Sequence, residues 1–256
     1  MIRNDADNGV QPSPAGAAAG LGELAQALEG FRPKQGPFIV GVTGAVASGK
    51  STLSNTLSAE LAAWPGPPRV EMVGTDGFLH PNQVLDARGL TARKGFPESY
   101  DVDALRRALR GVRQAATDFP GYSHVSYNID PALTRRIDRP DVLIIEGLSL
   151  DLDRGTGAGC RLIDALIYLD ADETDIERWF VSRFLGLWEA AEHDPTSFYT
   201  RFRGLDRDQV AAVARTVWGQ VNLPNLREHI ILARDIADIV VRKRGDHRIT
   251  SVNVQR

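Results

Sequence analysis

The 256-residue sequence lacks the features that mark secreted, membrane or nucleic-acid-binding proteins. It has one cysteine, Cys160, so no internal disulfide can form and a reducing compartment, the cytoplasm, is favoured. No run of about 18 apolar residues occurs, and Met1 to Gly20 has no apolar signal-peptide core, so we expect neither a membrane span nor a signal. The formal net charge of −3 provides no basic field for nucleic acid or an anionic membrane.

The composition, 43% hydrophobic and 25% charged, is that of an ordinary globular protein. The first 20 or so residues are rich in Gly, Ala, Pro, Asn and Asp and have no periodicity, and Leu21 to Leu28 offers at most a short helix. We therefore expect residues 1–30 to be a disordered or weakly helical arm. Residues 31–256 are expected to form one domain.

Short apolar segments alternate with amphipathic ones through that domain. The segments expected as strands are Phe38 to Thr43, Arg69 to Thr75, Asp141 to Gly147, Asp164 to Asp170 and Asp235 to Lys243. The segments expected as helices are Lys50 to Trp64, Asp101 to Val112, Glu173 to Ala191, and Asp206 to about Val221, the last ending near Pro224. This alternation predicts an α/β fold with a mostly parallel central sheet flanked by helices on both faces.

A glycine-rich motif, "GAVASGKS", joins the first strand to the first helix of the domain. It fits G-x-x-x-x-G-K-[ST], in which successive NH groups and a helix N-terminus bind phosphate, the lysine reaches the β and γ phosphates, and the serine binds magnesium. A chance match would not predict the flanking strand and helix. The expected nucleotide-binding residues are Gly44, Ala45, Val46, Ala47, Ser48, Gly49, Lys50, Ser51 and Thr52, of which Thr52 is read mainly as a first-turn helix residue.

Two carboxylates follow apolar strands, where ligands bind in open α/β sheets. Glu146 ends "DVLIIE" and is expected to face the metal or its water shell, although a solvent-facing acid is the alternative. Asp76 follows "VEMVGT" and could accept the proton of an acceptor hydroxyl. Taken alone, Asp76 would more simply open a turn with Gly77.

Several further motifs occur in the order "TDGFLHPN", "RGL", "KGFPESYD", "YSH" and "EGL". Together with the glycine-rich loop they closely resemble bacterial type I pantothenate kinase, a P-loop kinase of the phosphoribulokinase and uridine kinase group. The resemblance runs from about Phe38 to His247. It implies the three-layer P-loop kinase fold and transfer of phosphate from ATP, with Mg²⁺, to the primary hydroxyl of pantothenate, the first step toward coenzyme A.

The resemblance also implies roles for individual residues. Lys50 and Ser51 would bind phosphate and magnesium, Asp76 would be the catalytic carboxylate, and Arg183 would lie near the phosphates. The residues expected to contact pantothenate are Asp76, Tyr122, His124, Asn225 and the residue at position 180. His247 is a weaker candidate for stacking on adenine, and without the family match His124 would be read as structural. The segment from Phe78 to Tyr100 is expected to wall the acceptor pocket.

The sequence departs from the family at three positions. Phe180 stands where a tyrosine is usual, so a hydroxyl expected in the acceptor pocket is missing, and Leu187 replaces a phenylalanine. Asn55 occupies a basic position that contacts the feedback inhibitor coenzyme A, which predicts weakened inhibition. These departures leave open which alcohol is the acceptor.

Two alternatives therefore stand beside a pantothenate kinase. One is a paralogue that phosphorylates another small alcohol, such as a nucleoside or a pantothenate analogue. The other, from a different class, is a nucleotide-binding regulator that has lost catalysis, against which stand the retained Lys50, Ser51, Asp76 and Glu146. A GTPase is disfavoured because no N-K-x-D motif occurs. We expect no nucleic-acid or membrane partner and leave a homodimer open.

Overall fold

A computed structural model describes residues 14–148, 150–152 and 161–256. The first 13 residues of the expected arm, residues 1–30, and the single cysteine, Cys160, therefore lie outside the described residues. The described helix α1, Pro14–Glu29, begins earlier than the expected Leu21. Its side chains Leu21, Leu24 and Leu28 are buried in the core, so this end of the described chain packs onto the domain.

The described residues form eight strands in two sheets. Their bounds are β1 Phe38–Gly44, β2 Val70–Gly74, β3 Thr117–Ser123, β4 Asn128–Ile137, β5 Val142–Gly147, β6 Ala165–Asp170, β7 Ile239–Lys243 and β8 Ile249–Val254. The main sheet has the order β2-β5-β1-β6-β7-β8, and β8 alone runs antiparallel, against β7. A β3–β4 hairpin is the second sheet. The expected mostly parallel α/β sheet is confirmed, whereas the hairpin and β8 were not expected.

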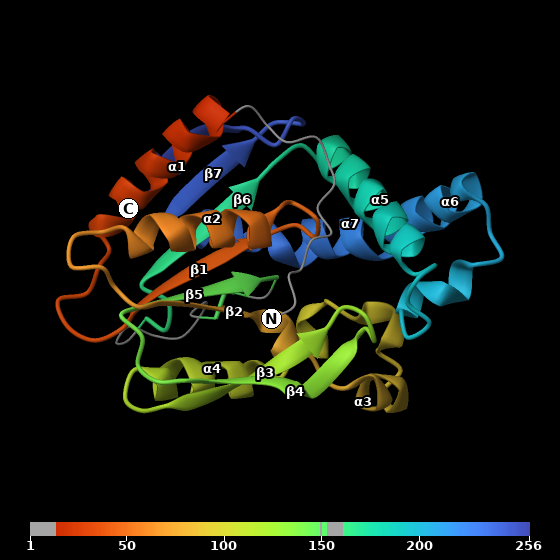
Figure 1. The fold of residues 1–256 in the computed structure, drawn as a ribbon, viewed down its shortest axis with the longest axis horizontal. Helices are drawn as coiled ribbons and strands as arrows, with labels where there is room; N and C mark the ends of the chain where they lie inside the picture. The colour runs from red at the N-terminus through yellow and green to blue at the C-terminus, as the bar shows by residue number, and fades with distance from the viewer. Residues whose placement is uncertain (1–13, 149, 153–160) are drawn as a thin grey trace.

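The helices cover the two faces of the main sheet (Figure 1). Their bounds, after α1, are α2 Lys50–Ala62, α3 Asn82–Ala87, α4 Val102–Val112, α5 Glu173–Ala190, α6 Arg207–Val217, α7 Leu223–Asn225 and α8 Leu232–Ile236. Short 3₁₀ segments are η1 Thr75–Phe78, η2 Thr91–Arg93, η3 Pro97–Ser99 and η4 Phe198–Phe202, and π segments are η5 Trp218–Asn222 and η6 Leu226–Ile230. The expected helices are present with ends shifted by a few residues.

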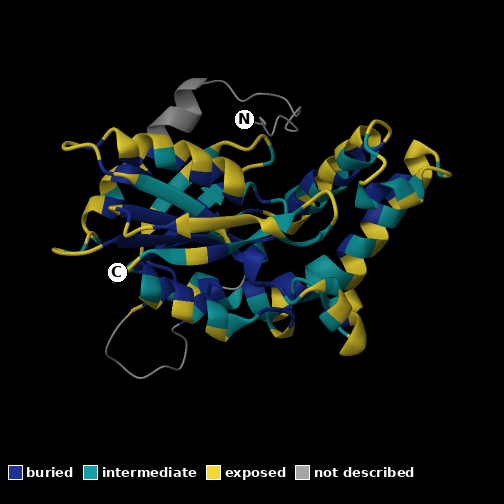
Figure 2. Ribbon diagram, turned by 60° about the horizontal axis from the view of Figure 1, so that its bottom comes forward, coloured by how far each residue is buried: buried dark blue, intermediate teal, exposed yellow. Residues whose placement is uncertain are grey.

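Strand side chains alternate between two cores, as the period of two requires. Ile39, Leu143 and Ile145 belong to the core under α4 and α8, while Val40 and Ile144 belong to the core under α1 and α2. Figure 2 shows buried strands in the middle of the main sheet, with partly exposed helices outside them. The central strands β1, β5 and β6 are buried along almost their whole length, which explains why their sequences are continuously apolar.

The helix that was expected to end near Pro224 continues beyond it. From α6 to α8 the chain stays helical, and the segments on both sides of Leu223–Asn225 are π-helical. Pro224 is the second residue of α7, between the two π segments, so its missing backbone N–H falls where the helical hydrogen-bond pattern changes. The wider π turns, which are frequent at functional sites, place Asn222 and Asn225 on the wall of the main cavity.

Candidate active site

The glycine-rich loop, residues 44–51, connects the end of β1 to the start of α2, as the sequence predicts. Gly49 precedes α2 with φ +90°, a backbone conformation that side chains disfavour, and a Cβ there would lie 2.6 Å from Nζ of Lys243. Lys243, on β7, donates a hydrogen bond to the carbonyl of Ser48 at 2.9 Å. Strand β7, which is separated from β1 by β6, therefore helps to hold the loop in shape.

Lys50 begins α2 and is 8% exposed. Its Nζ donates a hydrogen bond to the carbonyl of Ala45 at 2.8 Å. Burial lowers the pKa of Lys50, and the charges of Glu146 and Asp76 oppose that effect. An ammonium group held by one loop carbonyl and facing two carboxylates is placed to meet an anionic phosphate.

Ser51 and Glu146 face each other across the end of the sheet. The Ser51 hydroxyl donates a hydrogen bond to Oε1 of Glu146 at 2.7 Å. A hydroxyl and a carboxylate are oxygen ligands, which suit Mg²⁺. Among the described residues no group of three or more His, Cys, Asp or Glu forms a metal cluster, so a magnesium ion here would take its other ligands from phosphate and water. The residues fit a nucleotide-bound magnesium ion.

Asp76 lies in η1, directly after β2, and lines the same cavity as Lys50 and Glu146. Its carboxylate accepts a hydrogen bond of 3.4 Å from the Tyr100 hydroxyl. The adjacent Gly77 has no room for a side chain because a Cβ would collide with the carbonyl of Pro120 on β3. This close approach brings Asp76 beside the β3–β4 hairpin.

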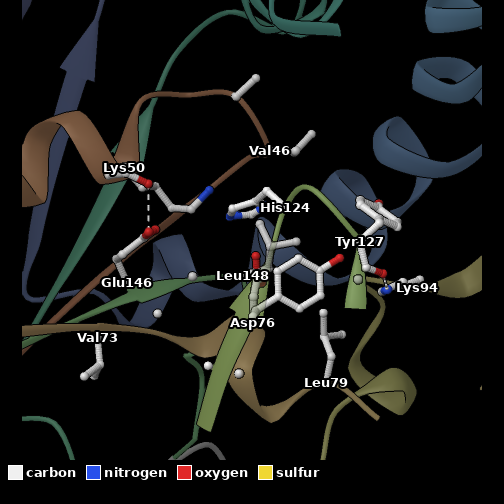
Figure 3. A pocket seen from close by; sticks show the side chains of 18 of the residues that line it. Val46, Lys50, Val73, Asp76, Leu79, Lys94, His124, Tyr127, Glu146 and Leu148 are labelled. Atoms are coloured by element: carbon white, nitrogen blue, oxygen red, sulfur yellow. Dashed lines mark hydrogen bonds between the residues drawn. The ribbon is translucent and has the colours of Figure 1, made fainter. Parts of the chain in front are cut away.

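The cavity that these residues share has a volume of about 520 Å³. Lys50 and Glu146 lie on one side of it and Lys94 and Tyr127 on the other, with Asp76 and His124 between them (Figure 3). The predicted site residues that line the cavity are Val46, Ala47, Lys50, Ser51, Asp76, Tyr122, His124, Glu146, Phe180, Arg183 and Asn225. Segments far apart in the sequence therefore converge on one chamber with a phosphate end and an acceptor end.

The hairpin supplies Tyr122 and His124, whose rings meet edge to face at 5.1 Å. Desolvation lowers the pKa of His124, so the imidazole is neutral at pH 7 and acts as a hydrogen-bonding group. Desolvation also raises the pKa of Tyr122, which keeps that phenol protonated. Both groups can bind the hydroxyls and amide of a polar ligand without adding charge.

Arg183 and Asn225 face the cavity from the helical end of the molecule. Arg183 is exposed on α5, and among the described residues it has no ion-pair partner. Asn225 is 4% exposed, and its amide group donates to the carbonyl of Gly95 at 2.8 Å, while its side-chain oxygen has no partner among the described residues. A buried acceptor atom without a partner at a cavity wall indicates a ligand contact.

Other predicted nucleotide residues lie outside the cavity wall. Gly44, Ala45, Ser48, Gly49 and Thr52 shape the loop and the first turn of α2 without lining the chamber. His247 also lies apart from it, stacked on Trp179 with ring centroids 4.3 Å apart, and has φ +66°. Its expected contact with adenine stays a prediction.

Among the cavity residues that the sequence did not single out are Lys94, Tyr127 and Tyr199, although Lys94 lies within the segment Phe78 to Tyr100 that was expected to wall the pocket. Lys94 donates to Oδ1 of Asn82 and to the carbonyl of Tyr127, both at 2.6 Å. Burial lowers its pKa to about 8, against the attraction of Asp76 and Asp86. Lys94 lies inside the quoted motif "KGFPESYD" and Tyr127 three residues after "YSH", so their motifs were the available signal. Nothing in the sequence singled out Tyr199.

The fold and this chamber define a P-loop kinase that transfers phosphate to a small molecule. The profile of the phosphoribulokinase/uridine kinase family matches residues 39–180. The chain belongs to that family and, within it, to the pantothenate kinases. It is 41% identical to the pantothenate kinase of Agrobacterium fabrum over 229 residues, covering 86% of this chain and 71% of that protein. It is 44% identical to that of Clavibacter sepedonicus over 235 residues, covering 90% and 74%.

A solved structure from Silicibacter sp. TM1040 is also similar. It bears the provisional name of a fructose transport system kinase, is 30% identical, and has a TM-score of 0.63 over 85% of this chain and 94% of that one. The described part of our chain contains no helix long and apolar enough to cross a membrane.

Proposed function

We propose that this protein transfers the γ phosphate of ATP to the primary hydroxyl of pantothenate. The observation that carries the proposal is the one chamber in which Lys50 and Ser51 lie at one end and Tyr122 and Asn225 at the other, with Asp76 and His124 between them (Figure 3). Relatives at 41% and 44% identity that bear the name pantothenate kinase support the choice of acceptor.

The acceptor oxygen would attack the γ phosphorus while the bond from that phosphorus to the β,γ-bridging oxygen breaks, and the electron pair leaves with ADP. Asp76 accepts the hydroxyl proton or orients the oxygen in line. Lys50 and Arg183 neutralise the charge on the transferred group. Ser51 and Glu146 would hold magnesium, which supplies electrostatic stabilisation of the phosphates when bound.

The chamber binds its acceptor through uncharged polar groups and one lysine. The protonated phenol of Tyr122, the neutral imidazole of His124 and the unpaired oxygen of Asn225 suit the hydroxyls and amide of pantothenate. The ammonium group of Lys94 suits its carboxylate.

A second candidate is phosphorylation of another small alcohol. Phe180 and Leu187 make part of the acceptor end apolar, and the similarity to a kinase named for fructose transport points the same way. Asn55 is neutral and exposed on α2, so we also expect coenzyme A to inhibit weakly. The single cysteine supports a cytoplasmic location.

The deciding experiment is an acceptor panel with ATP and Mg²⁺, containing pantothenate, fructose, a nucleoside and a pantothenate analogue. Product is identified by mass spectrometry and ADP release is timed. We expect pantothenate to give the highest kcat/KM. Negligible turnover of pantothenate beside efficient use of another alcohol would select the second candidate. ATP binding by titration calorimetry without product from any alcohol would indicate a regulator.

A further inference from the structure

Helix α5 contributes a largely apolar wall to the acceptor end of the chamber. The α5 residues that line the cavity are Phe180, Arg183, Phe184 and Leu187. Three of these four side chains are hydrocarbon. An acceptor with several polar groups would leave a hydroxyl or amide unpaired against this wall, which is costly when the ligand is desolvated.

Tyr199 is the polar group that borders this wall. It belongs to η4, beyond the end of α5, and lines the same cavity. Its ring meets that of Phe184 edge to face at 5.0 Å, and Phe184 in turn lies 6.1 Å from Phe180. The phenol therefore extends the row of rings from α5 and ends it with a hydroxyl group.

The backbone around Tyr199 is fixed by local hydrogen bonds. The Ser197 hydroxyl accepts from the N–H of Tyr199 at 3.3 Å, and the Thr200 hydroxyl donates to the carbonyl of Ser197 at 2.9 Å. Tyr199 itself is 9% exposed and packs against Phe202 as well as Phe184. Such a side chain is held in place before any ligand arrives, which lowers the entropy cost of binding.

Contacts between η4 and the hairpin fix Tyr199 relative to the acceptor-binding side chains. Phe198 donates its N–H to the carbonyl of Val125 at 2.8 Å, and its ring packs on Tyr127 at 4.7 Å. The phenol of Tyr199 is close enough to contribute to the raised pKa values of Tyr122 and Tyr127. The three phenols therefore occupy one region of the chamber.

The Tyr199 hydroxyl makes no hydrogen bond to a described residue and is not among the buried polar atoms, so it is accessible from the cavity although the residue as a whole is only 9% exposed. Burial raises the pKa of Tyr199, so the phenol is protonated at neutral pH and keeps a proton to donate. A donor that opens into a cavity and has no partner among the described residues is free to bond to what the cavity binds.

We propose that the Tyr199 hydroxyl donates a hydrogen bond to an oxygen of the bound acceptor and so determines specificity at the wall formed by Phe180, Phe184 and Leu187. The proposal rests on the proposed function, because it concerns the acceptor end of the same chamber. It also explains how the site can recognise a polar acceptor although Phe180 carries no hydroxyl group.

Tyr199→Phe is the test, because it removes one oxygen and keeps the ring that packs on Phe184. Two constants are measured for wild type and variant with the best alcohol from the acceptor panel. The KM for the alcohol is measured at saturating ATP, and the KM for ATP is measured at saturating alcohol. We expect the KM for the alcohol to rise on the order of tenfold, the effect of losing one hydrogen bond to a buried polar group. The KM for ATP and the melting temperature should stay unchanged.

Tyr168→Phe is the matched control. Tyr168 is a buried phenol on β6 that does not line the chamber, so its loss should leave both KM values unchanged. An unchanged KM for the alcohol in Tyr199→Phe would overturn the proposal, as would equal rises in both KM values, which indicate a structural role. Turnover by the wild type tests the proposed function separately, and only the ratio of variant to wild type tests Tyr199.

Discussion

The Ser51 hydroxyl donates a hydrogen bond to Oε1 of Glu146, 95 residues away in the sequence, at 2.7 Å. The contact joins the first turn of α2 to the carboxyl end of β5. Parallel pairing of β1 with β5 produces it, because Val42 and Thr43 lie in register with Glu146 and Gly147. Two separate motifs thereby meet in one place, where their oxygen atoms fit the magnesium ion that we propose.

Glu146→Gln should raise the concentration of magnesium that the reaction requires. The amide keeps the shape of the side chain and can still pair with Ser51, but it removes the negative charge from the metal site. We expect the Mg²⁺ concentration for half-maximal rate to rise about 10- to 100-fold, the usual scale for a change of this kind at a metal site. Initial rates measured over a magnesium titration at fixed ATP check this, and an unchanged titration curve would contradict it. Glu177→Gln, a change on α5 outside the chamber, is the control.

Asp76→Asn should separate catalysis from nucleotide binding. The amide retains the shape of Asp76 and can still accept the hydrogen bond from Tyr100. It cannot, however, take up the proton of the hydroxyl group that attacks the phosphate. We expect kcat to fall by at least about a hundredfold with ATP affinity unchanged. Steady-state kinetics and calorimetric titration of ATP measure the two quantities. Asp103→Asn on the exposed face of α4 provides a control carboxylate, and near-normal kcat in Asp76→Asn would rule out Asp76 as the base.

Lys94 should make acceptor binding depend on pH near 8. Burial lowers its pKa to about 8, while Asp76 and Asp86 oppose that shift and the rings of Tyr122 and Tyr127 lie beside the ammonium group. Above this pH the lysine loses its charge, so the KM for an acceptor that carries a carboxylate should rise as the pH increases from 7 to 9. The measurement that checks this is the KM for the acceptor at a series of pH values over that range.

Lys94→Arg provides the control for this pH effect. Because a guanidinium stays charged throughout the range, the rise in KM near pH 8 should disappear. A rise that persists in the variant would assign it to another group. The same pKa also affects stability: between about 8 and the usual value of 10.5 only the unfolded chain holds the proton, so this lysine makes the free energy of unfolding increase with pH.

The phosphate end of the chamber was predictable because its residues occupy fixed positions in local motifs. Lys50 and Ser51 follow a strand and open a helix, and Glu146 and Asp76 follow apolar strands, so the topology of a parallel sheet brings them together. The acceptor end depends on tertiary approach. Tyr199 reaches it where η4 packs on α5 and hydrogen-bonds to the hairpin through Phe198 and Val125, which lie far apart in the sequence.

The β3–β4 hairpin was missed for local physical reasons. Strand β3 contains Pro120 and Gly121, which disfavour regular strands, and the pairing shifts register between Phe119 and Gly121. Strand β4 is exposed over most of its length and reads as a polar segment. Neither strand shows the apolar alternation that identifies a half-buried strand in sequence. The hairpin nevertheless supplies Tyr122 and His124 to the cavity. An element that contributes to the candidate site was therefore harder to recognise in the sequence than the strands of the main sheet.

Lys243→Met should loosen the phosphate-binding loop. Lys243 is 7% exposed, and its ammonium group holds the Ser48 carbonyl at 2.9 Å. Methionine fills similar space but leaves that carbonyl without its charged donor, which costs about 1–3 kcal/mol. We expect the melting temperature to fall by several degrees, since about 1 kcal/mol lowers it by roughly 2–4 °C in a protein of this size.

Kinetics distinguish a specific effect of Lys243→Met on the loop from general destabilisation. Because Lys243 supports the loop and does not line the acceptor end, the KM for ATP should rise about tenfold at a temperature where the variant is folded, while the KM for the alcohol stays unchanged. Lys34→Met, at an exposed position before β1, should change neither quantity. A lower melting temperature with an unaltered KM for ATP would show that Lys243 stabilises the fold without shaping the loop for nucleotide.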